Sequence, residues 1–403
     1  MAAGPPDGFD NARRAAQDAW RAAQRAGRAA TDWLSRQPWL KRVAGWLGSD
    51  DWRVGAGAVA AGLVLVLGLV SALRPGPART PLMPGVTRVS IIGYFENGWS
   101  AEFGDSFPSV QQHYRLLDEV LAFWYSVDGT GDIVQDVSRE TVIRFVKSHG
   151  LKMGFLINNR QGDGATNYSM LTDPAARDRA IANIAGIVRN RGYDAVDVDF
   201  ELIPPETNVD MTKFVCLLRR ALPARTELSA AVFPPLDVDV SVNGAYDYKA
   251  LSDCTDYLVI MLYDFHYAGG PPGPLSPDRW TRRNVEWLLG HGVPAKKIVV
   301  AAGLYGLDWN LDAGNLAQER ALDGILGLAS DEGVTPKRDP QSGNPYFEYV
   351  DDNGNRHIVW YMDAGTLRTR IALVKEKGLR GIALWRLGYE VPHVWTTIRE
   401  TAR

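Results

Sequence analysis

The chain has 403 residues, of which 46% are hydrophobic and 23% charged. This composition is typical of a globular protein with room for one large domain and a further segment. The net charge of −3 provides no basic field, which argues against nucleic acid as a partner. Cys216 and Cys254 lie outside any metal-binding spacing, so we expect no metal and no cofactor. They are two buried thiols or a disulfide, and the sequence leaves both open.

Near the N-terminus, residues 54–73 read VGAGAVAAGLVLVLGLVSAL, which is 20 residues without a charge. A helix of this length crosses a bilayer core. A cleavable signal peptide fits poorly, because residues 1–53 are too long for its charged leader and no clear small-residue cleavage site follows. We therefore expect a transmembrane signal anchor. Residues 1–53 contain nine Lys and Arg and no Glu, which favours a cytoplasmic N-terminus and places the rest of the chain outside the cytoplasm.

Two segments flank this run. The basic N-terminal segment repeats arginine at helical spacing, which suits a helix on an anionic membrane surface or an ordinary solvated helix. Residues 74–86 contain the Pro- and Gly-rich sequence PGPARTPLMPGV and are expected to form a linker. A large domain over residues 87–403 follows.

In this domain, short apolar runs rich in Val and Ile alternate with helical patterns. Eight units of this kind in one domain predict an α/β fold, a (β/α)8 TIM barrel. A doubly wound sheet is the alternative, but no GxGxxG follows the first strand. The expected strands are 88–95, 119–124, 151–157, 194–200, 227–233, 256–263, 298–305 and 380–385.

The long gap before the last expected strand contains a second feature. The apolar runs 345–350 and 355–362 flank the turn sequence Asp-Asp-Asn-Gly, which predicts a β-hairpin. We expect a small hairpin insertion between strands 7 and 8, on the face that carries the functional site.

Acidic and apolar side chains alternate at the end of the fourth strand. Asp197, Asp199 and Glu201 share one face, because residues two apart in a strand point the same way. The apolar face should pack on helices, so the acids face the barrel interior. Such crowding raises at least one pKa, which suits a general acid, and Glu201 lies at the carboxyl end where barrel active sites form. An edge strand with a solvated acidic face is disfavoured, because parallel strands are buried on both sides.

This stretch resembles the DxxDxDxE signature of glycoside hydrolase family 18, the chitinase-like barrels. Three further segments resemble family motifs in the same order, and they are Ile260–Asp264, Gly303–Trp309 and Gly381–Gly388. They are most similar to the bacterial branch of N-acetylglucosaminidases that lyse cell wall and spore cortex. The resemblance covers about residues 88–400 and implies a carbohydrate-active hydrolase.

The resemblance also implies catalytic roles. Glu201 would protonate the glycosidic oxygen, and Asp199 would orient the substrate's N-acetyl group. Asp197 would share a proton with Asp199, and Tyr263 would hydrogen-bond the acetyl oxygen. The mechanism would retain configuration with the substrate's own acetamide as nucleophile.

Further positions are candidates for binding substrate. By resemblance, Asp264 would hold the same sugar and Trp385 would form the stacking floor beneath it. Tyr94, Asn158 and Tyr305 fall at strand ends, where they line the sugar cleft or pack in the barrel rim. For two more aromatic residues, Trp124 and Trp309, rim packing is favoured.

Three positions bear on the polymer. Phe200 stands where true chitinases often have Trp, in agreement with the cell-wall branch, whereas Asp197 is more typical of chitinases. Arg386 either binds a carboxylate on an acidic substituent or neutralises the interior acids, and we favour neutralisation. The choice between peptidoglycan and chitin-like polymers therefore stays open.

Together these features predict an enzyme that hydrolyses a β-linked N-acetylglucosamine polysaccharide, with this glycan and a membrane as partners. A non-catalytic, lectin-like barrel is the alternative. It is disfavoured because inactive relatives lose the terminal acid, which this chain keeps as Glu201. A membrane scaffold that binds other envelope proteins is a third and weaker alternative.

Overall fold

The computed structural model describes residues 88–100, 103–159, 168–314 and 316–403. The expected anchor at 54–73, the basic segment before it and the linker at 74–86 lie outside these residues, so those expectations stay untested. Within the described part of the chain, no helix is both long and apolar enough to span a bilayer.

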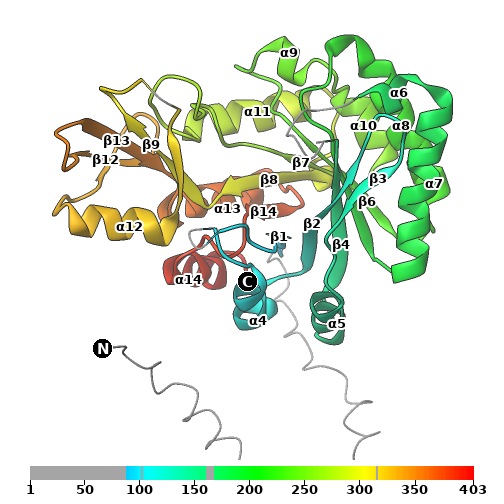
Figure 1. Ribbon diagram of the computed structural model, residues 1–403, viewed down its shortest axis with the longest axis horizontal. Coiled ribbons are helices and arrows are strands. Elements are labelled where there is room, and N and C mark those ends of the chain that lie inside the picture. The colour runs from blue at the N-terminus through cyan, green and yellow to red at the C-terminus, as the bar shows by residue number, and fades with distance from the viewer. Residues whose placement is uncertain (1–87, 101–102, 160–167, 315) are drawn as a thin grey trace, which may run out of the picture. The chain divides into compact units, whose positions relative to one another are not determined.

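Among the described residues, eight parallel strands close into a barrel (Figure 1). Strand β1 pairs with β14 on one side and β2 on the other, which closes the sheet. The predicted barrel is confirmed, and the doubly wound sheet is wrong. The strands are β1 (Ser90–Phe95), β2 (Glu119–Val127), β4 (Lys152–Asn158), β5 (Ala195–Asp199), β6 (Glu227–Val232), β7 (Tyr257–Ile260), β8 (Ile298–Gly303) and β14 (Gly381–Trp385).

Helices follow the strands and cover the barrel. Helix α7 shows how the sequence sets their limits: the Asp173 side chain accepts a hydrogen bond from the Ala175 amide at its start, and Gly192 ends it with φ of 65°. The helices are α4 (Phe107–His113), η1 (Tyr114–Leu116), α5 (Glu140–Ser148), α6 (Ser169–Thr172), α7 (Pro174–Arg191), η2 (Pro205–Thr207), α8 (Asn208–Ala221), α9 (Val240–Asn243), α10 (Tyr248–Cys254), α11 (Asp278–Gly290), η3 (Ala295–Lys297), α13 (Ala364–Glu376) and α14 (Pro392–Thr401).

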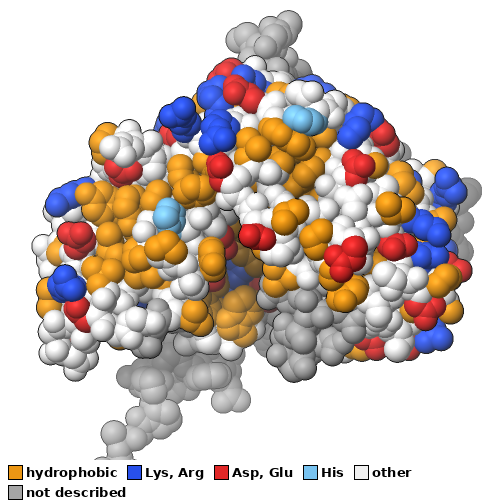
Figure 2. Space-filling view, turned by 90° about the horizontal axis from the view of Figure 1, so that it is seen from above, with side chains coloured by type: hydrophobic (Ala, Val, Ile, Leu, Met, Phe, Trp, Pro, Cys, Tyr) orange, Lys and Arg blue, Asp and Glu red, His pale blue; other side chains and the backbone are white. Residues whose placement is uncertain are grey.

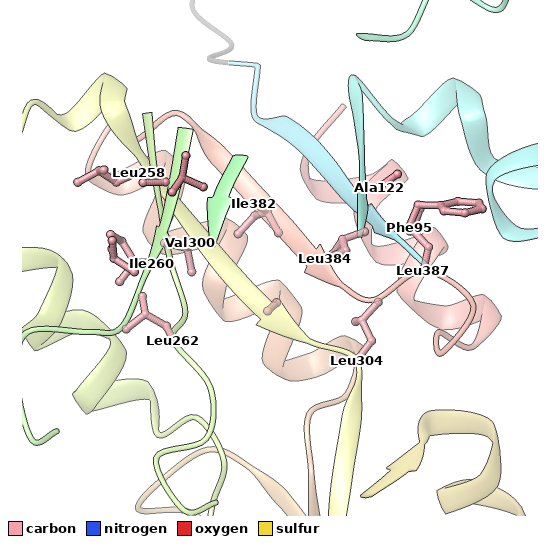
Figure 3. Packing of buried hydrophobic residues seen from close by; sticks show 14 of the residues in the cluster. Phe95, Ala122, Leu258, Ile260, Leu262, Val300, Leu304, Ile382, Leu384 and Leu387 are labelled. Atoms are coloured by element: carbon pink, nitrogen blue, oxygen red, sulfur yellow. The ribbon is translucent and has the colours of Figure 1, made fainter. Parts of the chain in front are cut away.

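The main core lies between the barrel strands and these helices. Alternate residues of each strand point outward, and Figure 3 shows Leu258 and Ile260 of β7, Val300 of β8 and Ile382 of β14 packed together. All four are fully buried. Burial of such a side chain contributes roughly 1.5–3 kcal/mol, so this layer fixes the barrel that carries the site.

A five-stranded antiparallel sheet is inserted between β8 and β14 within the described ranges, and it lies beside helix α12 in Figure 1. The predicted hairpin, β12–β13, is confirmed, but its description as a small hairpin insertion is wrong. An isolated hairpin is only marginally stable, and here β9 pairs with the second edge of β13. The elements are β9 (Tyr305–Asn310), β10 (Gln318–Ala321), α12 (Leu322–Asp331), β11 (Lys337–Arg338), β12 (Pro345–Val350) and β13 (Arg356–Tyr361); the short strand β3 (Ile133–Asp136) extends the barrel sheet beside β2.

The two cysteines form a disulfide. Cys216 of α8 and Cys254 at the end of α10 have Cα atoms 4.9 Å apart and are 38 residues apart in the chain. Of the two alternatives that the sequence left open, the structure therefore selects the paired one. The bond ties together neighbouring helices on the outside of the barrel.

Candidate active site

The carboxyl ends of the barrel strands surround a cavity of about 610 Å³. Figure 2 shows the surface hollowed near the middle of the view, with acidic and basic side chains among hydrophobic ones. Of the predicted site residues, every one except Asp197 lines this cavity. The lining residues are Tyr94, Glu96, Trp99, Phe123, Ser126, Gln135, Leu156, Asn158, Asp199, Glu201, Ala231, Phe233, Met261, Tyr263, Asp264, Tyr305, Glu319, Trp385, Arg386 and Tyr389.

Asp197 lies beneath the cavity, inside the barrel. It is fully buried and accepts hydrogen bonds from the Tyr94 hydroxyl at 2.7 Å and the Ser229 hydroxyl at 2.6 Å. Burial raises the pKa of Asp197 to about 6, although both hydrogen bonds favour the ionised form and lower it. Asp197 can therefore exchange a proton near neutral pH.

Asp199 and Glu201 continue this face toward the open mouth. Asp199 is buried at the end of β5, whereas Glu201 is partly exposed just beyond it. Asn159 fixes the main chain at Glu201 by accepting from its amide at 3.0 Å and donating to its carbonyl at 3.0 Å. Asn159 was not among the site residues predicted from the sequence. On the opposite face, Phe200 packs against Phe214 at 5.2 Å between ring centres, which confirms the alternation that turns the acids inward.

Tyr263 follows β7 and stands among the carboxylates. Burial and the negative charges of Asp199, Asp264 and Glu201 raise the pKa of Tyr263 well above its ordinary value. Its hydroxyl therefore stays protonated near neutral pH and can donate a hydrogen bond.

Asp264 lies next to Tyr263 in a left-handed backbone conformation with φ of 57°, and it accepts a hydrogen bond from the Tyr305 hydroxyl. Enclosure by the cleft walls raises its pKa to about 7. Since the residue is also exposed to solvent in the open cleft, solvent screens part of this effect. Tyr305 begins β9 rather than ending β8, so the inserted sheet positions it.

Trp385 and Asn158 complete the predicted set. Trp385 ends β14 and is partly exposed, and the rings of Tyr94 and Phe123 meet it edge-on at 5.5 and 5.8 Å between ring centres. Asn158 is buried at the end of β4, where its side chain accepts from Ser126 at 2.9 Å. The cavity therefore has an aromatic floor and a fixed amide in its wall.

Two tryptophans for which the sequence favoured rim packing do pack in this way. Trp124 is fully buried and donates to the Asn97 side chain at 3.2 Å, and Trp309 is 4% exposed and donates to the Gly270 carbonyl at 3.1 Å. Neither lines the cavity.

Other lining residues were not predicted. Glu96 follows Tyr94 by two positions on the same face of the chain, so strand periodicity could have found it. Glu319 comes from β10 of the inserted sheet, and no sequence pattern places this strand against the barrel. Within the described ranges, no group of three or more His, Cys, Asp or Glu side chains is arranged to hold a metal ion.

A barrel with stepped carboxyls and an aromatic floor at the carboxyl ends of its strands has the architecture of a glycoside hydrolase. More specifically, the chain belongs to the glycosyl hydrolases family 18, whose model matches residues 90–390.

Three Bacillus proteins are similar to this chain over most or part of its length. A putative sporulation-specific glycosylase, YdhD of Bacillus subtilis (strain 168), is 26% identical over 343 residues, which cover 82% of this chain and 81% of the relative. The cortical fragment-lytic enzyme of the same strain is 30% identical over 237 residues, or 57% of this chain and 55% of the enzyme. The crystal structure of the Bacillus cereus spore cortex-lytic enzyme SleL superposes on this chain with a TM-score of 0.72 at 25% identity. The superposition covers 80% of this chain and 76% of the SleL chain.

Proposed function

We propose that the protein hydrolyses β-linked N-acetylglucosamine-containing polysaccharide of the peptidoglycan or chitin type, with retention of configuration. The observation that carries this proposal is the single inward face on which Asp197, Asp199 and Glu201 rise from the barrel core to the cavity, with Tyr263 among them. The similarity to a putative sporulation-specific glycosylase and to a cortical fragment-lytic enzyme supports peptidoglycan as the polymer.

Glu201 is the general acid in this mechanism. It is the outermost of the three acids, it is partly exposed to the cavity, and Asn159 fixes its main chain. From this position it donates a proton to the glycosidic oxygen as the bond breaks. A positioned acid of this kind accelerates bond cleavage by typically about 10²–10⁴-fold.

The substrate's acetamide oxygen is the nucleophile. Asp199 and Asp197 lie below Glu201 on one strand face, whereas an enzymic nucleophile would stand across the sugar from the acid. Asp199 accepts from the acetamide N–H, and the Tyr263 hydroxyl donates to the acetamide oxygen. The two groups together hold the acetamide in a near-attack geometry.

Asp197 balances charge beneath Asp199. Because its pKa is raised to about 6, it gains or loses a proton at little cost as the charge on Asp199 changes during the reaction. The sugar itself stacks on Trp385, and Asp264, held by the Tyr305 hydroxyl, binds its polar edge.

Location outside the cytoplasm is part of the proposal. The uncharged run 54–73 would anchor the chain, and the disulfide between Cys216 and Cys254 suits an oxidising compartment. Protease added to intact cells should remove the barrel and spare the N-terminal segment. Complete protection of the barrel until the cells are lysed would contradict this topology.

Substitution of Glu201 tests the catalytic assignment. The purified protein is incubated with peptidoglycan and with N-acetylglucosamine oligomers, and the products are identified by mass. We expect Glu201→Gln to lower kcat by about 10²–10⁴-fold while glycan binding persists, because the amide keeps the shape and cannot supply the proton. The matched control is Glu206→Gln, at an exposed acid of η2, which should turn over like the wild type.

Two results would contradict the proposal. If Glu201→Gln kept more than about a tenth of the wild-type kcat, Glu201 would not be the acid. If the wild type bound these glycans and released no products, the protein would be a lectin-like barrel.

A further inference from the structure

Arg386 is a buried cation in the wall of the cavity. It follows Trp385 directly and is fully buried. Its Nη1 donates to the Gly104 carbonyl at 3.1 Å and the Ser106 hydroxyl at 3.3 Å. Among the described residues, its Nε and Nη2 donate no well-formed hydrogen bond, although the Tyr389 hydroxyl interacts with the guanidinium. Unpaired donors of a buried guanidinium are energetically unfavourable, so a ligand group that pairs them gains affinity.

The unpaired donors form a fork. Nε–H and Nη2–H lie on one edge of the planar guanidinium, the edge that binds both oxygens of a carboxylate. The ring centres of Trp99 and Tyr389 lie 4.7 and 4.1 Å from the guanidinium carbon and fix its plane. Trp99, Tyr389 and Arg386 all line the cavity, and Trp99 is 60% exposed.

No acid among the described residues occupies this fork. Within the described part of the chain, Arg386 makes no ion pair within 4.0 Å, although the charge of Arg386 is felt at Glu96. Burial raises the pKa of Glu96 to about 7, so near neutral pH a large part of this carboxyl is uncharged and competes weakly for the guanidinium. Neutralisation of the interior acids, the role favoured from sequence, therefore leaves the fork unexplained.

The position of Arg386 in the barrel indicates which sugar it would meet. In the closed sheet of described strands, β14 lies four places from β5 in either direction, so Arg386 stands across the mouth from Glu201. A sugar stacked on Trp385 that presents its cleaved bond to Glu201 presents its other end toward Arg386. This end carries the neighbouring sugar on the non-reducing side.

We propose that the Nε–Nη2 edge of Arg386 binds a carboxylate carried by the sugar on the non-reducing side of the one stacked on Trp385. The ligand class is an N-acetylhexosamine with an acidic substituent, such as the lactyl carboxylate of N-acetylmuramic acid. The inference rests on the proposed function and deepens it. In a polymer that alternates N-acetylglucosamine with the acidic sugar, this contact places N-acetylglucosamine on Trp385. The bond on the reducing side of N-acetylglucosamine is then cleaved, so the products end in reducing N-acetylglucosamine.

The test compares matched substrates. Alternating oligosaccharides with free lactyl carboxylates are assayed beside the same oligosaccharides with these groups converted to neutral methylamides, and kcat/KM is measured for each. For the wild type we expect a preference of about 10–100-fold for the carboxylated form, the usual value of a charge-assisted pair. Arg386→Gln should abolish this preference. Arg386→Lys should lose most of it, because lysine keeps the charge without the fork.

Arg368→Gln, at an exposed arginine of α13, is the control and should keep the wild-type preference. A wild-type enzyme with equal kcat/KM on both forms, or an Arg386→Lys variant with the full preference, would overturn the proposal.

Binding separates this inference from the proposed function. Calorimetry with the carboxylated and neutral disaccharides needs no turnover, so it measures the carboxylate preference even if the wild type cleaves no glycan. The absence of cleavage would refute the proposed function and leave the role of Arg386 to the calorimetry. The affinities of the wild type for the two disaccharides also measure the carboxylate preference if Arg386→Gln fails to fold. Equal affinity of the wild type for the two disaccharides would overturn the role of Arg386.

Discussion

Removal of the Tyr94 hydroxyl should shift the titration of Asp197. This carboxyl is fully buried, and Tyr94 and Ser229 donate its hydrogen bonds at 2.7 and 2.6 Å. Its pKa of about 6 lies above the ordinary 3.8, because burial outweighs the two hydrogen bonds. In Tyr94→Phe the carboxylate loses one of these donors.

The size of the effect follows from the strength of such a bond. A hydrogen bond to a charged group contributes about 1.5–3 kcal/mol, and a change of one in pKa corresponds to about 1.4 kcal/mol. Tyr94→Phe should therefore raise the pKa of Asp197 by about one to two, to roughly 7–8.

The sign for stability is fixed by the direction of the shift. Because the folded-state pKa of Asp197 is raised, its contribution to stability is fully present below pH 3.8 and is lost as pH rises through about 6. In the wild type this loss amounts to about 3 kcal/mol. In Tyr94→Phe the loss of stability should continue up to about pH 8 and should be larger by about 1.5–3 kcal/mol.

Urea unfolding between about pH 5 and pH 9 measures this difference. Tyr94→Phe should be close to the wild type at the acid end and fall progressively below it at the alkaline end. Tyr248→Phe is the matched control, because Tyr248 donates to the Phe233 carbonyl rather than to a carboxylate, and its loss should be the same at every pH. A constant difference between Tyr94→Phe and the wild type would refute the reasoning.

Two further variants test the floor and the disulfide. Trp385→Ala should weaken glycan binding with little loss in Tm. Trp124→Ala, at a fully buried tryptophan outside the cavity, should cost about 3–5 kcal/mol of stability and leave the glycan affinity of the folded fraction unchanged. If Trp385→Ala instead lowered the Tm strongly and left glycan affinity unchanged, Trp385 would be a core residue. Cys216→Ser should lower the free energy of unfolding by about 4 kcal/mol, because the bond to Cys254 closes a long loop. Dithiothreitol should lower the Tm of the wild type and not that of Cys216→Ser, and equal sensitivity of both would show that the disulfide contributes nothing.

Strand periodicity accounts for what the sequence predicted best. A parallel strand between helices must bury its apolar face outward, so the alternation before Glu201 already turned Asp197 and Asp199 into the barrel. The expected strand ends placed Tyr94 at the sugar cleft, the family resemblance gave Trp385 its stacking role, and the structure brings both residues to one cavity.

The inserted sheet marks the limit of this reasoning. The apolar run 298–305 continues across the end of β8 at Gly303 into β9, and hydrophobicity alone contains no sign of the change of direction. The sheet is held by contacts between distant segments: Asp308 accepts from Arg320 at 3.0 Å and from Tyr349 at 2.8 Å. A pattern read along the chain cannot contain such pairings, and Glu319 was missed for this reason.

The central claim is that the substrate's own acetamide acts as nucleophile while Glu201 supplies the proton. Rapid NMR of the wild-type protein acting on N-acetylglucosamine oligomers, with a parallel assay on fully deacetylated oligomers, tests it most directly. We predict that the β-anomer appears first and that the deacetylated oligomers are not cleaved. Initial α-anomer, or equal rates on both substrates, would contradict the mechanism and direct attention to Asp264 as the second carboxyl.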